Sequence, residues 1–125
     1  MQYDVFLADG PARTTLEVIG GSWSAIVITA LGERPRRYTE LLDRIGGISR
    51  KVLTQVLRRL EHDGLVMRTA SPTTPRVAHY RLTALGESTL VPVHALVAWA
   101  VTYTQQLLDA RKAAGADAAS ERQSG

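Results

Sequence analysis

Apolar residues recur with a helical period along most of this 125-residue chain. Glycine and proline separate the periodic segments from one another. The period predicts five helices, which cover residues 11–19, 22–32, 39–45, 49–63 and 83–112. The second contains consecutive β-branched residues, so a buried strand is the alternative there; its length and an N-cap at Ser22 favour the helix. Thr39 is the expected N-cap of the third.

The fourth helical segment combines an apolar stripe with a basic opposite face. Ser49 is a suitable N-cap for it, and Gly64 a suitable stop. Positions i, i+3, i+4 and i+7 of the stripe are Leu53, Val56, Leu57 and Leu60. The other face carries Arg50, Lys51, Thr54, Gln55, Arg58 and His62. Two short helices joined by a glycine turn, the second amphipathic and basic, are typical of a helix-turn-helix.

Two segments after this helix alternate with a period of two instead. They are "LVMRTAS" and "VAHYRLT", and the turn-rich stretch "SPTTPR" lies between them. This arrangement predicts a β-hairpin. A helix-turn-helix followed by a hairpin is a winged helix, so the expected fold class is mainly α with a small β-hairpin.

The last helix is apolar over more of its surface than one small domain needs. Pro92 should kink it or lie near its start. A second copy of the chain is the natural partner for such a face, and the N-terminal "YDVFL" adds further apolar side chains. The expected dimer contacts are Tyr3, Val5, Phe6, Leu90, Val93, Leu96, Val97, Ala100, Tyr103 and Leu107. Residues 1–112 would form a single winged-helix domain with its dimerisation segments, and residues 113–125 a disordered tail.

Composition and charge narrow the class of protein. The chain is 45% hydrophobic, which suffices for a core, and its net charge of +3 permits a polyanionic partner without requiring one. It has no cysteine, which excludes disulfides, thiol nucleophiles and thiol redox switches. The stretch "MQYDVFLADG" at the start lacks the basic n-region of a secretory signal, and no apolar run reaches the length of a membrane span, so we expect a cytoplasmic protein without membrane contact.

The cations of the fourth helix admit two interpretations. Charged residues opposite an apolar stripe are usually only a solvated face. The residues at its N-terminal half, however, are of the types that bond base edges, and a basic hairpin follows. "ERPRRYTEL" adds arginines that could hold phosphate, and Arg76 would reach the backbone or minor groove from the wing. The expected DNA contacts are Arg36, Arg37, Thr39, Ser49, Arg50, Lys51, Thr54, Gln55, Arg58 and Arg76. Among them, Arg50, Lys51 and Gln55 should discriminate bases, and Arg36 and Arg37 should position the backbone.

Enzymatic interpretations have little support in the sequence. The three histidines show no metal-ligand spacing, and no phosphate-binding loop, dinucleotide fingerprint or nucleophile elbow is present. We therefore expect no catalysis, no metal and no cofactor. Trp23, Trp99 and Tyr103 are more typical of a core than of a ligand platform, although a small-molecule pocket lined by them is an alternative.

Three stretches in order resemble a known family. They are "LEVIGGSWSAIVITAL", "RRYTELLDRIGGISRKVLTQVLRRLEHDGLVMR" and "VAHYRLTALGESTLVPVHALVAWA". They are similar to the HxlR family of bacterial winged-helix transcriptional regulators, which are distant relatives of the MarR group. The resemblance implies a homodimer that binds operator DNA through the fourth helix and the wing. Many family members carry a sensing cysteine before the proline of the first helix; here that residue is Gly10, so any signal must be a non-covalent ligand.

Two functions are consistent with these observations. The first is a homodimeric, sequence-specific regulator that binds double-stranded DNA at an inverted repeat and responds, if to anything, to a small-molecule effector. The alternative is a winged-helix small-molecule sensor or protein-interaction module in which DNA binding is secondary. A steep dependence of DNA affinity on salt distinguishes the first from the second.

Overall fold

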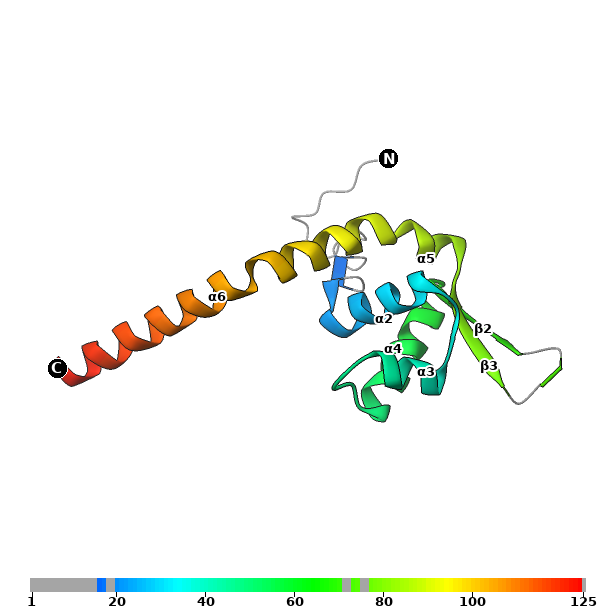
Figure 1. Ribbon diagram of the computed structural model, residues 1–125, viewed down its shortest axis with the longest axis horizontal. Coiled ribbons are helices and arrows are strands. Elements are labelled where there is room, and N and C mark those ends of the chain that lie inside the picture. The colour runs from blue at the N-terminus through cyan, green and yellow to red at the C-terminus, as the bar shows by residue number, and fades with distance from the viewer. Residues whose placement is uncertain (1–15, 18–19, 71–72, 75–76, 125) are drawn as a thin grey trace. The chain divides into compact units, whose positions relative to one another are not determined.

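The structure, a computed structural model, describes residues 16–17, 20–70, 73–74 and 77–124 (Figure 1). It consists of two compact units, Met1–His94 and Ala95–Gly125, which are treated separately below. Within the helix predicted for residues 11–19, only residues 16 and 17 are described, and they are helical, as is Gly20. The other positions of that helix lie outside the described residues.

Three helices form the centre of the first unit. They are α2 (Ser22–Glu33), α3 (Tyr38–Arg44) and α4 (Arg50–His62). The helical prediction for α2 is confirmed, although its N-cap is Gly21 rather than Ser22. The core that these helices share with the strands contains Val27, Ile28, Leu31, Leu41, Ile45, Leu53, Leu57, Leu60, Val66 and Leu82. The leucine stripe predicted for α4 is therefore the face that the domain buries, except that Val56 is only half-buried.

A small antiparallel sheet completes the winged helix. Strands β2 (Val66–Ala70) and β3 (Ala78–Leu82) pair as the predicted hairpin, with Val66 opposite Leu82. A short strand that the sequence did not predict, β1 (Arg36–Arg37), pairs with the other edge of β3, which gives the order β1-β3-β2. Figure 1 shows the hairpin extending away from the helices of this unit. The predicted fold class is confirmed, with one strand more than expected.

Thr83 connects the sheet to the helices that follow. Its backbone N–H donates to the carbonyl of Leu65 at 3.0 Å, and its hydroxyl donates to the carbonyl of Gly64 at 2.6 Å. The same hydroxyl accepts from the N–H of Gly86 at 3.0 Å and so caps α5 (Ala84–Ser88). Gly64 itself has φ +76°, a left-handed conformation that favours glycine and allows α4 to turn directly into β2.

The final helix, α6, runs from Leu90 to Ser124 and begins with Pro92 in its first turn, where proline is tolerated. It continues through the residues predicted to be a disordered tail, so the boundary at Lys112 was placed too early. That stretch is rich in alanine, the strongest helix former, which explains the difference. In the part of the chain that the structure describes, no helix is long and apolar enough to cross a membrane.

Two residues at the start of α6 are used within the first unit. Val93 is only 1% exposed, and Leu90 packs so closely over Gly32 that a methyl group there would lie 2.6 Å from its Cδ2. Both were predicted to contact a second chain. For Val93 the prediction was wrong, because its side chain is already buried in its own chain.

Candidate nucleic-acid interface

The N-terminal half of α4 presents polar side chains to solvent. Arg50, Lys51, Gln55 and Arg58 are exposed, and Thr54 is half-buried. The helix begins where predicted, since Ser49 Oγ accepts the N–H of Val52 at 3.1 Å. Within the described residues, the three cations among them form no ion pair with an acidic side chain. Their charge is therefore available to an external anion.

Tyr38, the first residue of α3, forms contacts with the start of α4 that the sequence did not reveal. Its hydroxyl donates to the carbonyl of Arg50 at 2.9 Å and lies 3.0 Å from Thr54 Oγ1. The guanidinium carbon of Arg50 lies 5.9 Å from the centre of the Tyr38 ring, within cation–π range. Tyr38 therefore fixes both the angle between α3 and α4 and the surroundings of two expected DNA contacts.

Arg36 does not belong to this surface. It is 6% exposed, and its Nε donates to the carbonyl of Ala30 at 3.0 Å. Its Nη2 lies 2.8 Å from Glu33 Oε1, so the guanidinium is held at the C-terminal end of α2. The prediction that Arg36 positions the DNA backbone was therefore wrong, because the side chain turns into the domain and ties β1 to α2.

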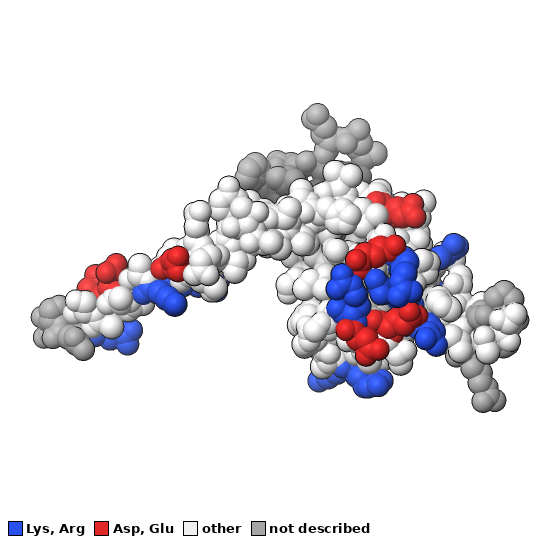
Figure 2. All heavy atoms as spheres, in the orientation of Figure 1, with Lys and Arg blue, Asp and Glu red and all other residues white. Residues whose placement is uncertain are grey.

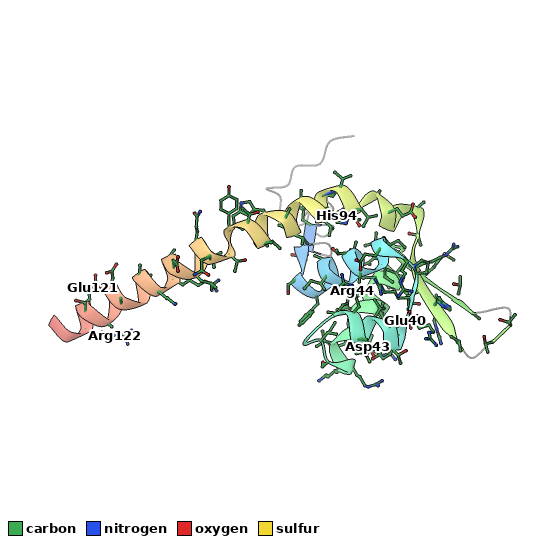
Figure 3. The ribbon with its side chains drawn as sticks, viewed as in Figure 1. Glu40, Asp43, Arg44, His94, Glu121 and Arg122 are labelled. Carbon is green, nitrogen blue, oxygen red and sulfur yellow. The ribbon has the colours of Figure 1, made fainter. Side chains whose placement is uncertain are left out.

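The other charges near α3 are also paired with one another. Glu33 bonds Arg44 through both of its oxygens, at 3.0 and 3.1 Å, and these bonds lower the pKa of Glu33. Glu40 contacts Arg37 at 3.1 Å and Arg34 at 3.3 Å. Figure 2 shows the resulting mixture of acidic and basic side chains over α3, and Figure 3 shows Glu40 and Arg44 on that helix. Every arginine of this patch thus has a carboxylate partner, although four arginines share two carboxylates, whereas the cations at the start of α4 have no such partner among the described residues.

Glu40 caps its own helix. Arg37, not Thr39, is the N-cap of α3, and its N–H donates to Glu40 Oε1 at 3.0 Å. That bond, together with the one from the Arg37 side chain, holds the pKa of Glu40 at about 2, below its ordinary value of 4.5. Thr39 is nevertheless exposed in the first turn of α3, where a phosphate could reach it.

The depressed pKa of Glu40 predicts a pH-dependent stability. Glu40→Gln should lower the urea midpoint at pH 7, because the carboxylate no longer accepts from Arg37. A carboxyl whose pKa is lowered in the folded state stabilises the fold above pH 4.5, and this contribution is lost as the pH falls toward 2. The difference in urea midpoint between wild type and variant should therefore shrink between pH 4.5 and pH 2. Asp43→Asn on the same helix is the control. A difference that stays constant from pH 7 to pH 2 would contradict this assignment.

A groove of about 430 Å³ lies between the start of α3 and the wing. Its lining comes from β1, α3 and both strands of the hairpin: Arg37, Tyr38, Thr39, Arg68, Val77, Ala78 and Tyr80. The side chains of two arginines and two tyrosines thus line one hollow, although the Tyr38 hydroxyl is engaged with α4. The Tyr80 hydroxyl is a hydrogen-bond donor at neutral pH, where a phenol is protonated, and burial raises its pKa further. Such donors suit a phosphodiester oxygen.

Several expected site residues are not tested by this geometry. Tyr3, Val5, Phe6 and Arg76 lie outside the described residues. Trp23 is half-buried on α2 in the first unit, whereas Trp99 and Tyr103 lie on α6 in the second, with ring centres 5.5 Å apart. The expected ligand pocket combines residues of both units and therefore remains a prediction.

The described residues contain no group of three or more acidic or histidine side chains that could hold a metal ion. What they do contain is a capped, exposed basic helix, a wing, and a groove between α3 and the wing.

Comparison with known proteins identifies the family. Residues 18–107 match the HxlR-like helix-turn-helix family along their whole length. The chain belongs to the HxlR family. It is 38% identical over 96 residues to the HTH-type transcriptional regulator YtfH of Escherichia coli, which covers 77% of this chain and 76% of that protein. YkvN of Bacillus subtilis, another HTH-type transcriptional regulator, is 40% identical over 94 residues, 75% of this chain and 80% of the relative.

Solved structures agree with this assignment to the HxlR family. The transcriptional regulator YtfH from Salmonella typhimurium superposes with a TM-score of 0.77 at 32% identity, over 89% of this chain and 99% of the other. The protein is accordingly a transcriptional regulator with a helix-turn-helix DNA-binding domain, and not an enzyme.

Proposed function

We propose that this HxlR-family regulator binds an inverted-repeat operator as a homodimer, with the first turns of α4 in the major groove. The observation that carries the proposal is the contrast between two sets of cations. Around α3, the arginines pair with Glu33 and Glu40. At the start of α4, the cations stay exposed and have no acidic partner among the described residues. Exposed cations without an acidic partner at the start of a helix are suited to an anionic partner at that place.

The groove between α3 and the wing supports a backbone contact beside the major-groove contact. Arg68 is exposed on β2, and Arg37, although paired with Glu40, keeps half of its side chain exposed (51%). A phosphate in this groove would meet both guanidinium groups and the hydroxyl of Tyr80. We assign these residues to positioning, because phosphate contacts fix the register of the protein without reading the sequence.

The homodimer is proposed from the second unit. Between Ala95 and Ser124, helix α6 leaves Leu96, Trp99, Tyr103 and Leu107 exposed, each at 39% or more. A symmetric pairing of this stripe would bury it against its own copy. It would also present two recognition helices to successive major grooves, which requires an inverted repeat. Since the chain has no cysteine, a thiol cannot sense an effector, and we expect any effector of this regulator to bind non-covalently.

Salt titration of DNA binding tests the proposal. Affinity for duplexes from the region flanking its own gene should fall steeply with rising salt, with a slope of about −0.9 per phosphate neutralised. Arg50→Ala should weaken binding by about 1–3 kcal/mol. Arg44→Ala is the matched control, because that guanidinium is already paired with Glu33, and its affinity should change less than about twofold. A flat salt response, or an equal loss in both variants, would contradict the proposal.

A further inference from the structure

The hydrogen bonds around Tyr38 determine which atom donates each proton. The Tyr38 hydroxyl carries one hydrogen, and the Arg50 carbonyl, 2.9 Å away, can only accept. That hydrogen is therefore committed to the carbonyl. Thr54 Oγ1 lies 3.0 Å from the same phenolic oxygen, and since Tyr38 has no second hydrogen, Thr54 must be the donor in this bond.

This arrangement leaves the Thr54 hydroxyl able only to accept a hydrogen bond from an external partner. A free threonine hydroxyl donates one hydrogen bond and accepts others, so it can contact either kind of base edge. Here the proton of Thr54 points at Tyr38, and only its lone pairs remain for an external partner. The side chain is half-buried, so part of it stays open to solvent.

We infer that Tyr38 converts Thr54 into an obligate acceptor, and that Thr54 thereby selects a base with an exocyclic amino group. In the major groove only adenine N6 and cytosine N4 present such donors, whereas thymine O4 and guanine O6 are acceptors that would face the threonine lone pairs. Thr54 is the residue that determines specificity at this one position, and Tyr38 is a positioning residue that acts through it. The inference rests on the proposed placement of α4 in the major groove.

Tyr38→Phe isolates the hydroxyl. The variant keeps the ring over which the Arg50 guanidinium lies and removes the hydroxyl, which accepts the threonine proton and donates to the Arg50 carbonyl. Thr54 can then rotate and donate, so it would tolerate thymine or guanine at the same place. A purely structural role of the phenol would instead weaken binding to every sequence equally.

The experiment selects binding sites for the full-length protein from a randomised duplex library and then measures affinity on the four duplexes that differ at one base pair. For the unmodified protein, one position in each half-site should favour adenine or cytosine on one strand over thymine or guanine by about 5-fold. Tyr38→Phe should bring that ratio close to 1 while the other positions keep their preferences. Thr54→Val should abolish the preference at the same position, and Thr54→Ser should retain it.

Two further variants complete the test. The double variant should have the same base preference at this position as Thr54→Val alone, because the tyrosine acts on that preference only through the threonine. Tyr80→Phe, which removes another hydroxyl from a residue that lines the groove, should leave every base preference unchanged.

Unaltered preferences in both Tyr38→Phe and Thr54→Val, or a uniform loss of affinity in both, would overturn the inference while leaving the proposed function standing. If Tyr38→Phe failed to fold by circular dichroism, the Thr54 variants would decide alone. An unmodified protein without any sequence preference would refute the proposed function itself, and the inference with it.

Discussion

Replacing Gly86 with alanine should lower the free energy of unfolding by about 2 kcal/mol or more. A Cβ at this position would lie 2.0 Å from the carbonyl oxygen of Leu65, far inside van der Waals contact. That carbonyl cannot move freely, because it accepts the N–H of Thr83 where α4, β2 and α5 meet. Overpacking against a backbone atom typically costs about 1–3 kcal/mol or somewhat more. The helix propensity gained from alanine, about 1 kcal/mol, offsets only part of this cost.

Urea unfolding of Gly86→Ala measures the effect, and Gly115→Ala is its control. Gly115 also lies within a helix, α6, but no atom lies within 4 Å of its added Cβ. Alanine should therefore be neutral or slightly stabilising there. If both variants unfolded at the same urea concentration as the wild type, the close approach at Gly86 would not constrain the fold.

Helix α4 was predictable because its signals are local. Leucines at helical spacing must face one side, and Leu53, Leu57 and Leu60 are indeed between 0 and 2% exposed. The cap at Ser49 and the stop at Gly64 follow from single-residue chemistry that needs no knowledge of the rest of the fold. The exposed cations opposite the stripe follow from the same periodicity.

The surroundings of that helix were not predictable, because they depend on contacts between distant residues. Tyr38 bonds residues 12 and 16 positions further along the chain, and no sequence spacing indicates such a contact. Arg36 and Arg37 are adjacent and chemically identical, yet one is buried and the other exposed. Strand alternation separates them: β1 turns Arg36 toward α2 and leaves Arg37 at the surface. A two-residue strand is too short to show this alternation in the sequence.

Sequence composition was misleading at the C-terminal end. Small and polar residues after Lys112 are typical of disordered tails. The same residues include many alanines, whose helix propensity is the highest of all, and the structure extends α6 through them. The dimer contacts predicted near the start of α6 illustrate a related limit. Periodicity marked Val93 as apolar but could not tell whether its own domain or a second chain would bury it.

The dimer leads to the largest expected effect on function, which is the loss of operator binding in Leu96→Asp. Five residues of α6, Leu96, Trp99, Ala100, Tyr103 and Leu107, lie within an arc of about 100° around the helix axis. Leu96 is 47% exposed in the single chain, so aspartate there should not unfold the winged domain. In a symmetric pairing, the same substitution would place a charge in a desolvated interface, which is strongly unfavourable.

Light scattering and operator binding measure the two consequences together. The unmodified protein should have twice the mass of its 13.6 kDa chain at micromolar concentration, and Leu96→Asp should have the mass of one chain. A monomer contacts only one half-site, so its operator affinity should fall by at least about 100-fold, the usual gain from linking two binding modules. Val101→Asp is the control, since Val101 is 77% exposed and lies on the other side of the helix from the stripe. An unmodified protein with the mass of a single chain would refute the dimer. The inverted-repeat operator would then be refuted as well, because two linked half-sites are needed only if two recognition helices bind as one unit.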